Sequence, residues 1–385
     1  MINGKPFRSY SPFVGDEELF RGAVRSFLDR EVDARVAEYE DGSLPIRHLW
    51  KVGASEGIIG VRVPEQFGGQ GAPAIFNIVV SYELGRSIGY ATVGTSICTD
   101  NATNLLLVGG SDAAKAELLP RILDGQIQAM GFTEPDAGTN SSNLRTSARR
   151  DGDEWVINGN KCFISMGDQA DIIYVVTRTD GDADRAGRFT LFAVDAPTDG
   201  LQRRKLDALG LPVHGLGELF FDDVRVPAHR MIGPLGGGLK MLSGMMAIDR
   251  VQTPARALGQ AELALDLVIE YAKIRRVHEG RPLIEFQNTK MKLAEMATQI
   301  RAAQTLLTEA LDKMRNGVLT NTDSAICKVF LTDVSARVVD ESVQLFGANG
   351  LAGENVMSRI YASNRQFRIL AGTSELLKIS IASRL

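Results

Sequence analysis

The chain has 385 residues, of which 44% are hydrophobic and 23% are charged, and its formal net charge is −4. This length accommodates two or three domains with substantial cores, and the charge leaves no excess of Lys and Arg to neutralise nucleic-acid phosphates. No stretch approaches about 18 uninterrupted apolar residues, so no membrane span is expected.

The three cysteines, Cys98, Cys162 and Cys327, are widely spaced. Their spacing provides neither a disulfide framework nor the ligand pattern of a zinc site. We therefore expect a chain without a bound metal that works in the reducing cytoplasm.

The first third of the sequence predicts helices. Within residues 17–40 the apolar side chains Phe20, Val24, Phe27 and Leu28 recur at the helical period, with charged residues between them. Similar patterns cover residues 48–56, 75–88, 93–108 and 113–123, and glycines separate them. Residues 1–126 are thus predicted to form an all-helical domain.

The middle of the sequence changes to short strand patterns, at residues 127–134, 171–179, 188–196 and 217–226. Several short strands at this spacing predict a compact β-barrel or sandwich over residues 127–235. Long helical patterns return at residues 238–275, 284–315, 321–345 and 374–383, and such helices bury their apolar faces as a bundle. The predicted fold is a multi-domain α+β protein with a C-terminal four-helix bundle over residues 236–385.

Two motifs stand in the middle segment: FTEPDAGTN at residues 132–140 and GNKCFIS at residues 159–165. A strand that stops at Thr133, Glu134 and Pro135 leaves backbone groups unpaired beyond its end, because proline cannot continue a sheet. Those groups are available to a ligand.

Together the two motifs resemble the flavin-binding core of the acyl-CoA dehydrogenase family, in which the corresponding sequences are close to LTEPxAGSD and GxKxWIT/S. The resemblance continues through FFDDVRVP, FQNTKMKLAEMA, QLFGANG and AGTSE, and so covers nearly the whole chain. It implies the helical, β and helical-bundle architecture, FAD as cofactor, and an oxidoreductase acting on CH–CH groups (EC 1.3).

The resemblance also assigns residues to the flavin ring. Thr133 stands where a hydroxyl or backbone group meets the pyrimidine edge, and Phe163 where the family usually has a tryptophan against the ring. Ser165 stands where a hydroxyl approaches flavin N5. Thr139 and Asn140 occupy the family's Ser-Asp positions, which meet phosphate or pantetheine.

The rest of the cofactor is expected to meet residues of the last third. Arginine suits bidentate contact with the pyrophosphate, and either Arg275 or Arg276 matches that position. The family's other cofactor contacts fall on Gln287, Gln344, Gly347, Thr373 and Glu375. Some of these positions serve a partner subunit in the family, so the resemblance implies a homo-oligomer, expected to be a tetramer.

The catalytic base departs from the common pattern. Many family members carry it as the first residue of EGTxE, where this chain has Ala371. Asp249 matches the position of the glutamate in the isovaleryl-type branch, and its alternative is an ion pair with a nearby arginine. Asp100 is a second candidate acid, for which helix capping is the alternative. Arg250 is expected to contact the nucleotide portion of CoA.

The predicted reaction is FAD-dependent dehydrogenation of an acyl thioester carried by CoA or by an acyl carrier protein. Electrons would then pass to an electron-transfer flavoprotein. Two alternatives stay open. One is a flavin oxidase or monooxygenase on the same fold, and the other is a non-catalytic flavoprotein, which is suggested by the alanine at position 371. Acyl length and branching are not predicted, because fold likeness alone does not define a substrate.

Overall fold

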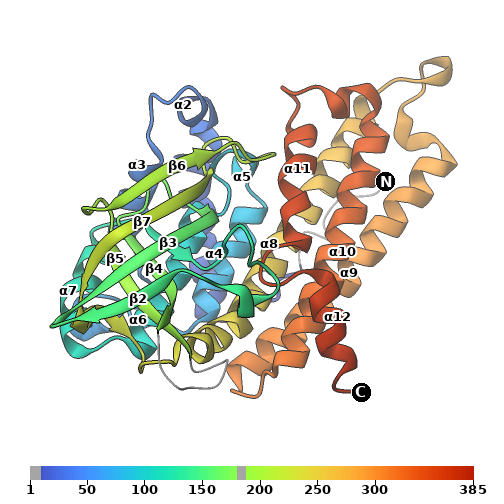
Figure 1. Ribbon diagram of the computed structural model, residues 1–385. Helices are drawn as coiled ribbons and strands as arrows, with labels where there is room; N and C mark the ends of the chain where they lie inside the picture. Colours follow the sequence, from blue (N-terminus) through green and yellow to red (C-terminus); the bar gives the residue numbers. More distant parts are fainter. Residues whose placement is uncertain (1–9, 180–187) are drawn as a thin grey trace. The chain divides into compact units, whose positions relative to one another are not determined.

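The computed structural model describes residues 10–179 and 188–385, which form two compact units (Figure 1). The helical unit comprises the described part of Met1–Val36, together with Ile75–Ala91 and Ala247–Leu385. The β unit comprises Ala37–Ala74 and Thr92–Met246. Each unit therefore depends on contacts between segments that are far apart in the sequence.

The helical unit is built mainly from long helices, of which α9 and α10 run side by side (Figure 1). Its helices are α1 (Asp16–Glu31), α4 (Ile75–Gly85), the part of α8 (Gly238–Ile274) from Ala247 onward, α9 (Gln287–Arg315), α10 (Asn321–Phe346), α11 (Val356–Asn364) and α12 (Ser374–Ala382). Its 3₁₀ turns are η1 (Asp33–Arg35), η7 (His278–Gly280), η8 (Leu283–Glu285), η9 (Gly347–Leu351) and η10 (Arg365–Arg368). Helix α11 has no counterpart among the predicted helices.

Helices α4 and α8 approach each other closely within the helical unit. A Cβ atom added at Gly259 would lie 2.3 Å from the carbonyl oxygen of Tyr82, a distance that real Cβ atoms do not reach. Three residues along α8, the Glu262 carboxylate accepts a hydrogen bond from the Tyr82 hydroxyl over 2.7 Å. The contact therefore requires a residue without a side chain at position 259.

We predict that Gly259→Ala lowers the free energy of unfolding by about 2 kcal/mol, because the added methyl group must push two backbones apart. Gly244→Ala is the matched control in the same helix, since a Cβ there meets nothing within 4 Å. The control should raise stability by about 0.5–1 kcal/mol, since alanine favours helix over glycine. Urea unfolding of both variants checks the pair, and equal effects would contradict the close approach.

The β unit combines shorter helices with one sheet. Its helical elements are α3 (Ile46–Ser55), η2 (Glu65–Phe67), η3 (Ser96–Ala102), α6 (Thr103–Gly109), α7 (Asp112–Leu123), η4 (Ser141–Asn143) and η6 (Ala228–Arg230). Two short helices, α2 (Val36–Glu40) and α5 (Tyr90–Val93), lie at the joints of the chain between the units.

The sheet has eight strands in the order β6-β7-β3-β2-β4-β5-β8, and β1 pairs in parallel with β4 (Figure 1). The strands are β1 (Gln128–Gly131), β2 (Ser147–Asp151), β3 (Glu154–Ser165), β4 (Ile172–Thr179), β5 (Phe189–Asp195), β6 (Leu201–Leu206), β7 (Leu216–Pro227) and β8 (Met231–Ile232). The predicted order of helical, β and helical segments is confirmed.

Helix α7 covers the core of the β unit. Its buried Leu118 and Ile122 share one apolar cluster with Tyr174 of β4 and Leu191 of β5. At the edge of this cluster the guanidinium of Arg230 pairs with Glu117 of α7 over 2.5 Å and with Asp195 of β5 over 2.6 Å. The hydrogen bond from Arg230 holds the pKa of Glu117 at about 2. Arg230 thereby ties η6 to α7 and β5.

Two predicted helices are interrupted. The pattern over residues 17–40 is broken at η1, where the Asp33 carboxylate accepts hydrogen bonds from the Ser87 hydroxyl and from the Gly89 N–H, the latter at 3.0 Å. The pattern over residues 93–108 contains η3 rather than continuous α-helix. In the first case the partners lie more than fifty residues away, so the apolar period alone does not reveal the break.

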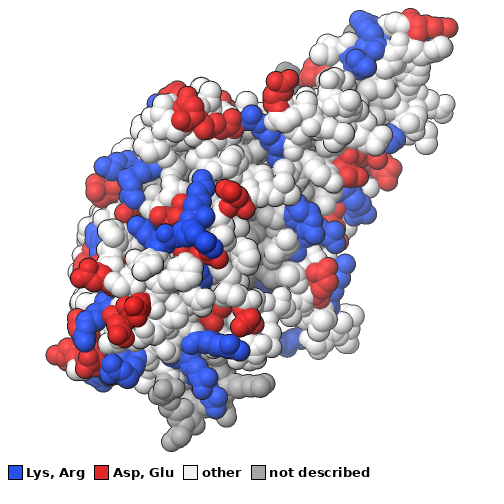
Figure 2. Space-filling model, turned by 45° about the horizontal axis from the view of Figure 1, so that its top comes forward, with Lys and Arg blue, Asp and Glu red and all other residues white. Residues whose placement is uncertain are grey.

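None of the helices in the described part of the chain combines the length and apolar character that a membrane crossing requires. On the face shown in Figure 2, basic and acidic side chains alternate in small groups. This distribution is what a nearly balanced charge of −4 leads one to expect.

Candidate active site

Thr133 and Phe163 lie on neighbouring segments of the β unit, where β1 has just ended and β3 continues. The backbone N–H of Cys162 donates a hydrogen bond to the Thr133 carbonyl over 2.9 Å. Thr133 is therefore fixed beside the residue that precedes Phe163. The structure thus brings together two of the predicted flavin-ring residues from separate motifs.

Phe163 has an unusual backbone for a strand residue, with φ of 57°. The pairing of β3 with β7 is irregular between Lys161 and Ile164, which lets the Phe163 side chain turn outward. This side chain is 62% exposed in the β unit. A left-handed backbone costs a non-glycine residue on the order of 1–3 kcal/mol and is typical of ligand sites. The exposed ring is a surface that a flat ligand would cover.

Ser165 follows two residues later, is half-buried, and pairs with Leu216 of β7. The donor set of this region suits the isoalloxazine ring of FAD: Phe163 offers an apolar face, and Thr133 and Ser165 offer hydroxyl groups. The residues present therefore fit the cofactor that the resemblance implies.

Thr139 and Asn140 lie in the polar loop between β1 and β2, and both are exposed. The Asn140 side chain accepts hydrogen bonds from the N–H of Ser142 over 3.2 Å and from its hydroxyl over 2.7 Å. Asn140 thereby caps the short turn η4, and its amide nitrogen stays available to a ligand.

Glu134 and Lys161 are two residues for which the sequence analysis has no role. The Lys161 ammonium has no exposed side-chain surface and donates to the Glu134 carboxylate over 2.8 Å. The same carboxylate accepts the backbone N–H groups of Arg145 at 2.7 Å and Thr146 at 3.0 Å. Both residues stand inside the two motifs, but a strand pattern does not tell which charged residue is buried with a partner.

Asp100 is buried in the β unit and is engaged by its own neighbours. Its carboxylate accepts hydrogen bonds from the Gly60 N–H at 3.1 Å, the Thr103 hydroxyl at 2.9 Å and the Gln128 amide at 3.2 Å. These bonds join three segments of the β unit. The Asp100 carboxylate therefore connects these segments. Asp249, in the helical unit, is half-buried.

Asp249 belongs to the part of α8 that lies in the helical unit. The adjacent Arg250 donates from Nε to the carbonyl oxygen of Ala371 over 3.4 Å. Ala371 itself has a left-handed backbone, with φ of 55°. The structure therefore places positions 249 and 371, at which the resemblance implies a base, on adjoining segments.

The segment around Ala371 is held from a second side by Lys328 of α10, a residue that no sequence motif indicated. The Lys328 ammonium donates to the carbonyl oxygen of Gly372 over 2.8 Å, and burial lowers the pKa of Lys328 to about 8. Thr373 follows as the N-cap of α12, where its hydroxyl accepts the N–H of Leu376 at 3.3 Å. Glu375 is exposed in the first turn of the same helix.

A separate group of predicted cofactor residues gathers at one end of the helical unit. Tyr271 of α8 stacks on Phe346 of α10 with ring centroids 4.2 Å apart, and Lys292 of α9 pairs with Glu341 of α10. These contacts bring the end of α8, the start of α9 and the end of α10 together. The predicted residues carried by these three segments are Arg276, Gln287, Gln344 and Gly347, all of them exposed.

Arg276 lies in the excursion between α8 and α9, which extends beyond the neighbouring helix ends in Figure 1. It forms an isolated β-bridge with Pro282. Gly347 follows α10 with φ of 61°, a conformation that glycine adopts without strain. Thr373 and Glu375 belong to the other group, beside Ala371.

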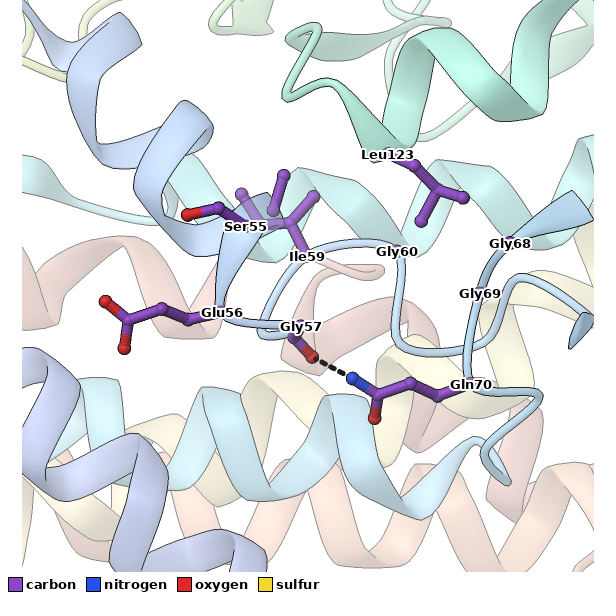
Figure 3. A pocket seen from close by; sticks show the side chains of 10 residues that line it. Ser55, Glu56, Gly57, Ile59, Gly60, Gly68, Gly69, Gln70 and Leu123 are labelled. Carbon is purple, nitrogen blue, oxygen red and sulfur yellow. Dashed lines mark hydrogen bonds between the residues drawn. The ribbon is translucent and has the colours of Figure 1, made fainter.

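A cavity of about 320 Å³ opens in the β unit between the end of α3 and the glycine-rich segment 57–70 (Figure 3). The Gln70 amide donates to the Gly57 carbonyl across it over 3.4 Å. Glu56 is the one charged residue among those that line it, and no predicted site residue is among them. Because none of the predicted site residues lines this cavity, it is not the candidate site.

Comparison with known proteins agrees with this geometry. The chain matches the family models described as acyl-CoA dehydrogenase N-terminal domain at residues 15–126, middle domain at residues 129–224 and C-terminal domain at residues 236–385. The (2S)-methylsuccinyl-CoA dehydrogenase of Cereibacter sphaeroides is 34% identical over 96% of this chain and 70% of its own length.

Solved structures show the same likeness. The acyl-CoA dehydrogenase from Geobacillus kaustophilus superposes with a TM-score of 0.91 at 31% identity, covering 97% of this chain and 98% of its own. A glutaryl-CoA dehydrogenase from Mycobacterium smegmatis in complex with FADH2 has a TM-score of 0.88 at 27% identity, over 97% and 95% of the two chains. With all three domains matched and full-length relatives at this identity, the chain belongs to the acyl-CoA dehydrogenase family.

Proposed function

We propose that this chain dehydrogenates an acyl-CoA thioester, and that Asp249 is the base that takes the α-proton. The reaction class rests on family membership: the protein is an FAD-dependent oxidoreductase acting on CH–CH groups. FAD, when bound, supplies the acceptor for the hydride from the β-carbon.

The observation that carries the role of Asp249 is the hydrogen bond from Arg250 to the Ala371 carbonyl, at 3.4 Å. The resemblance implies that the family's base stands either at position 371 or at position 249. Because the two segments adjoin, a carboxylate at position 249 of α8 would reach the same region as a glutamate at position 371. Geometry of this kind is the first requirement of a general base.

Other residues of the chain would bind and orient. In the β unit Phe163 would cover one face of the flavin ring, while Thr133 and Ser165 donate to its polar edge. Arg250 would meet the nucleotide portion of CoA, and Asn140 the pantetheine or phosphate. In the helical unit Thr373 and Glu375 stand at the N-terminus of α12, where backbone N–H groups favour phosphate.

We also propose a homo-oligomer, in keeping with the tetramers implied by the resemblance. The described C-terminal helices carry several large apolar side chains that are mostly exposed in one chain, among them Leu351 at 76% and Ile379 at 68%. Exposed apolar surface of this kind is typical of an interface. A molar mass equal to one chain in light scattering would contradict this assembly.

The function is tested with the flavin as the reporter. Under anaerobic conditions the holoenzyme is mixed with straight, branched, dicarboxylic and ring acyl-CoAs, and with the same acyl groups on an acyl carrier protein. We expect at least one CoA thioester to bleach the flavin and to lose two hydrogens by mass. Turnover should require an electron-transfer flavoprotein, whereas rapid oxygen uptake with peroxide release would identify an oxidase instead.

A further inference from the structure

We infer that the buried pair of Lys161 and Glu134 positions the flavin cradle of the β unit, so that its loss weakens FAD binding and alters the environment of the bound ring. This inference rests on the proposed function, because it assigns a task to residues that touch no reacting atom. Lys161 and Glu134 would therefore be positioning residues.

The pair joins the two motifs that carry the predicted flavin residues. The Lys161 ammonium donates to the Glu134 carboxylate over 2.8 Å and to the carbonyl oxygen of Phe132 over 3.1 Å. Phe132 immediately precedes Thr133, and Lys161 comes two residues before Phe163. One ammonium group thus fixes the separation of the two segments that present Thr133 and Phe163.

Glu134 extends the connection to the far end of the polar loop. Its carboxylate accepts the N–H groups of Arg145 and Thr146, which lie where the loop returns to β2. The Thr146 hydroxyl in turn donates to the carbonyl oxygen of Asn160 in β3 over 3.1 Å. The loop that carries Thr139 and Asn140 is closed at its base by these bonds.

The electrostatics favour a charged pair at neutral pH. Burial lowers the pKa of Lys161 to about 8, which still leaves its amine protonated. Burial alone would raise the pKa of Glu134, but the charge of Lys161 and the hydrogen bonds from Lys161, Thr146 and Arg145 outweigh it, so this pKa lies below its ordinary value. Removing one partner would leave a buried charge without compensation, whereas removing both charges avoids that penalty.

A variant that removes both charges can therefore separate a role of the pair in positioning the flavin cradle from a role in folding stability. The double variant K161M/E134Q leaves no uncompensated charge but loses the bond to Phe132, and so it releases the cradle. We expect it to unfold within a few degrees of the wild type. It should nevertheless bind FAD at least tenfold more weakly, and the visible circular dichroism of its bound flavin, recorded at saturating FAD, should differ from the wild type.

A control removes another ion pair of the same unit, in which the Arg230 side chain is buried and Glu117 is exposed. The double variant R230M/E117Q loses the pair between α7 and η6, neither of which contains a predicted flavin residue. We expect it to bind FAD within twofold of the wild type. Should K161M/E134Q fail to fold, E134D keeps both charges and only shortens the side chain, and it should weaken FAD binding about fivefold with an altered flavin spectrum.

The measurement is titration of the full-length apoprotein with FAD, followed by flavin fluorescence and visible circular dichroism. The inference is overturned if K161M/E134Q, or E134D in its place, binds FAD within twofold of the wild type with an unchanged spectrum. Equal losses in the control variant would overturn it as well, because they would reflect general destabilisation. Wild-type protein that takes up no FAD would instead contradict the proposed function.

Discussion

Replacing Asp249 with asparagine is expected to slow reduction of the bound flavin by acyl-CoA about 10³-fold, the usual contribution of a positioned base. Asparagine preserves the size of the side chain but cannot accept the α-proton. FAD binding should be unaffected, since no cofactor contact is assigned to Asp249. Anaerobic stopped-flow recording of the flavin absorbance, at saturating substrate, measures the rate directly.

A second substitution should restore part of this activity. In D249A/A371E the carboxylate moves to the segment that Arg250 contacts through the Ala371 carbonyl. Ala371 already has the left-handed φ of 55°, so a glutamate there adds little further backbone strain. Its side chain is also one methylene longer than that of aspartate. We expect the double variant to reduce flavin at least tenfold faster than D249A alone.

Asp266→Asn is the control for this pair, because Asp266 is another acid of α8 and lies 3.9 Å from Arg86. It should reduce flavin at the wild-type rate. Flavin reduction by D249N within tenfold of the wild type would remove Asp249 from the mechanism. A base elsewhere, such as Asp100, would then have to be tested in the same way.

The second large effect is expected at Phe163. Its side chain is 62% exposed in the β unit, so a flavin ring stacked on it would bury most of that surface. Phe163→Ala should weaken FAD binding by about 3 kcal/mol, roughly 100-fold, from lost apolar burial and lost ring stacking. Equilibrium titration of the apoprotein with FAD provides the dissociation constant.

Phe163→Trp should bind FAD as tightly as the wild type or more tightly, because it enlarges the stacking surface and matches the usual residue of the family. Phe220→Ala is the control: Phe220 is also an exposed phenylalanine of the same sheet, at 39%, and no flavin contact is assigned to it. If F163A and F220A bind FAD equally well, the ring does not lie on Phe163.

The sequence predicts the helices and strands whose signals are local. Long amphipathic patterns lead to α9 and α10, and short apolar runs lead to β4 and β5. The sequence does not predict a break that depends on distant residues. At Asp33 the predicted helix is interrupted, and the Asp33 carboxylate accepts hydrogen bonds from Ser87 and Gly89. The grouping of α4 with the last third of the chain, where it contacts α8 at Gly259, likewise depends on residues far apart in the sequence.

The candidate site also combines residues with local sequence signals and residues whose contacts appear only in the fold. Thr133, Phe163 and Ser165 are predicted as flavin residues from the resemblance of two short motifs, which are contiguous in the sequence. The ion pair of Lys161 and Glu134 cannot, since alternation along a strand does not tell which charged residue is buried with a partner. The contact of Arg250 with Ala371 joins residues 121 positions apart and becomes visible only in the fold.

The role of Asp249 is tested most directly with an acyl-CoA labelled with deuterium at the α-carbon, which is mixed with the oxidised holoenzyme in a single turnover without oxygen. If Asp249 takes the α-proton, the visible flavin band fades, the label is found in water, and the fading is several-fold slower than with unlabelled substrate. In D249N the label should stay on the substrate. Bleaching and label release that continue unchanged in D249N would contradict the account.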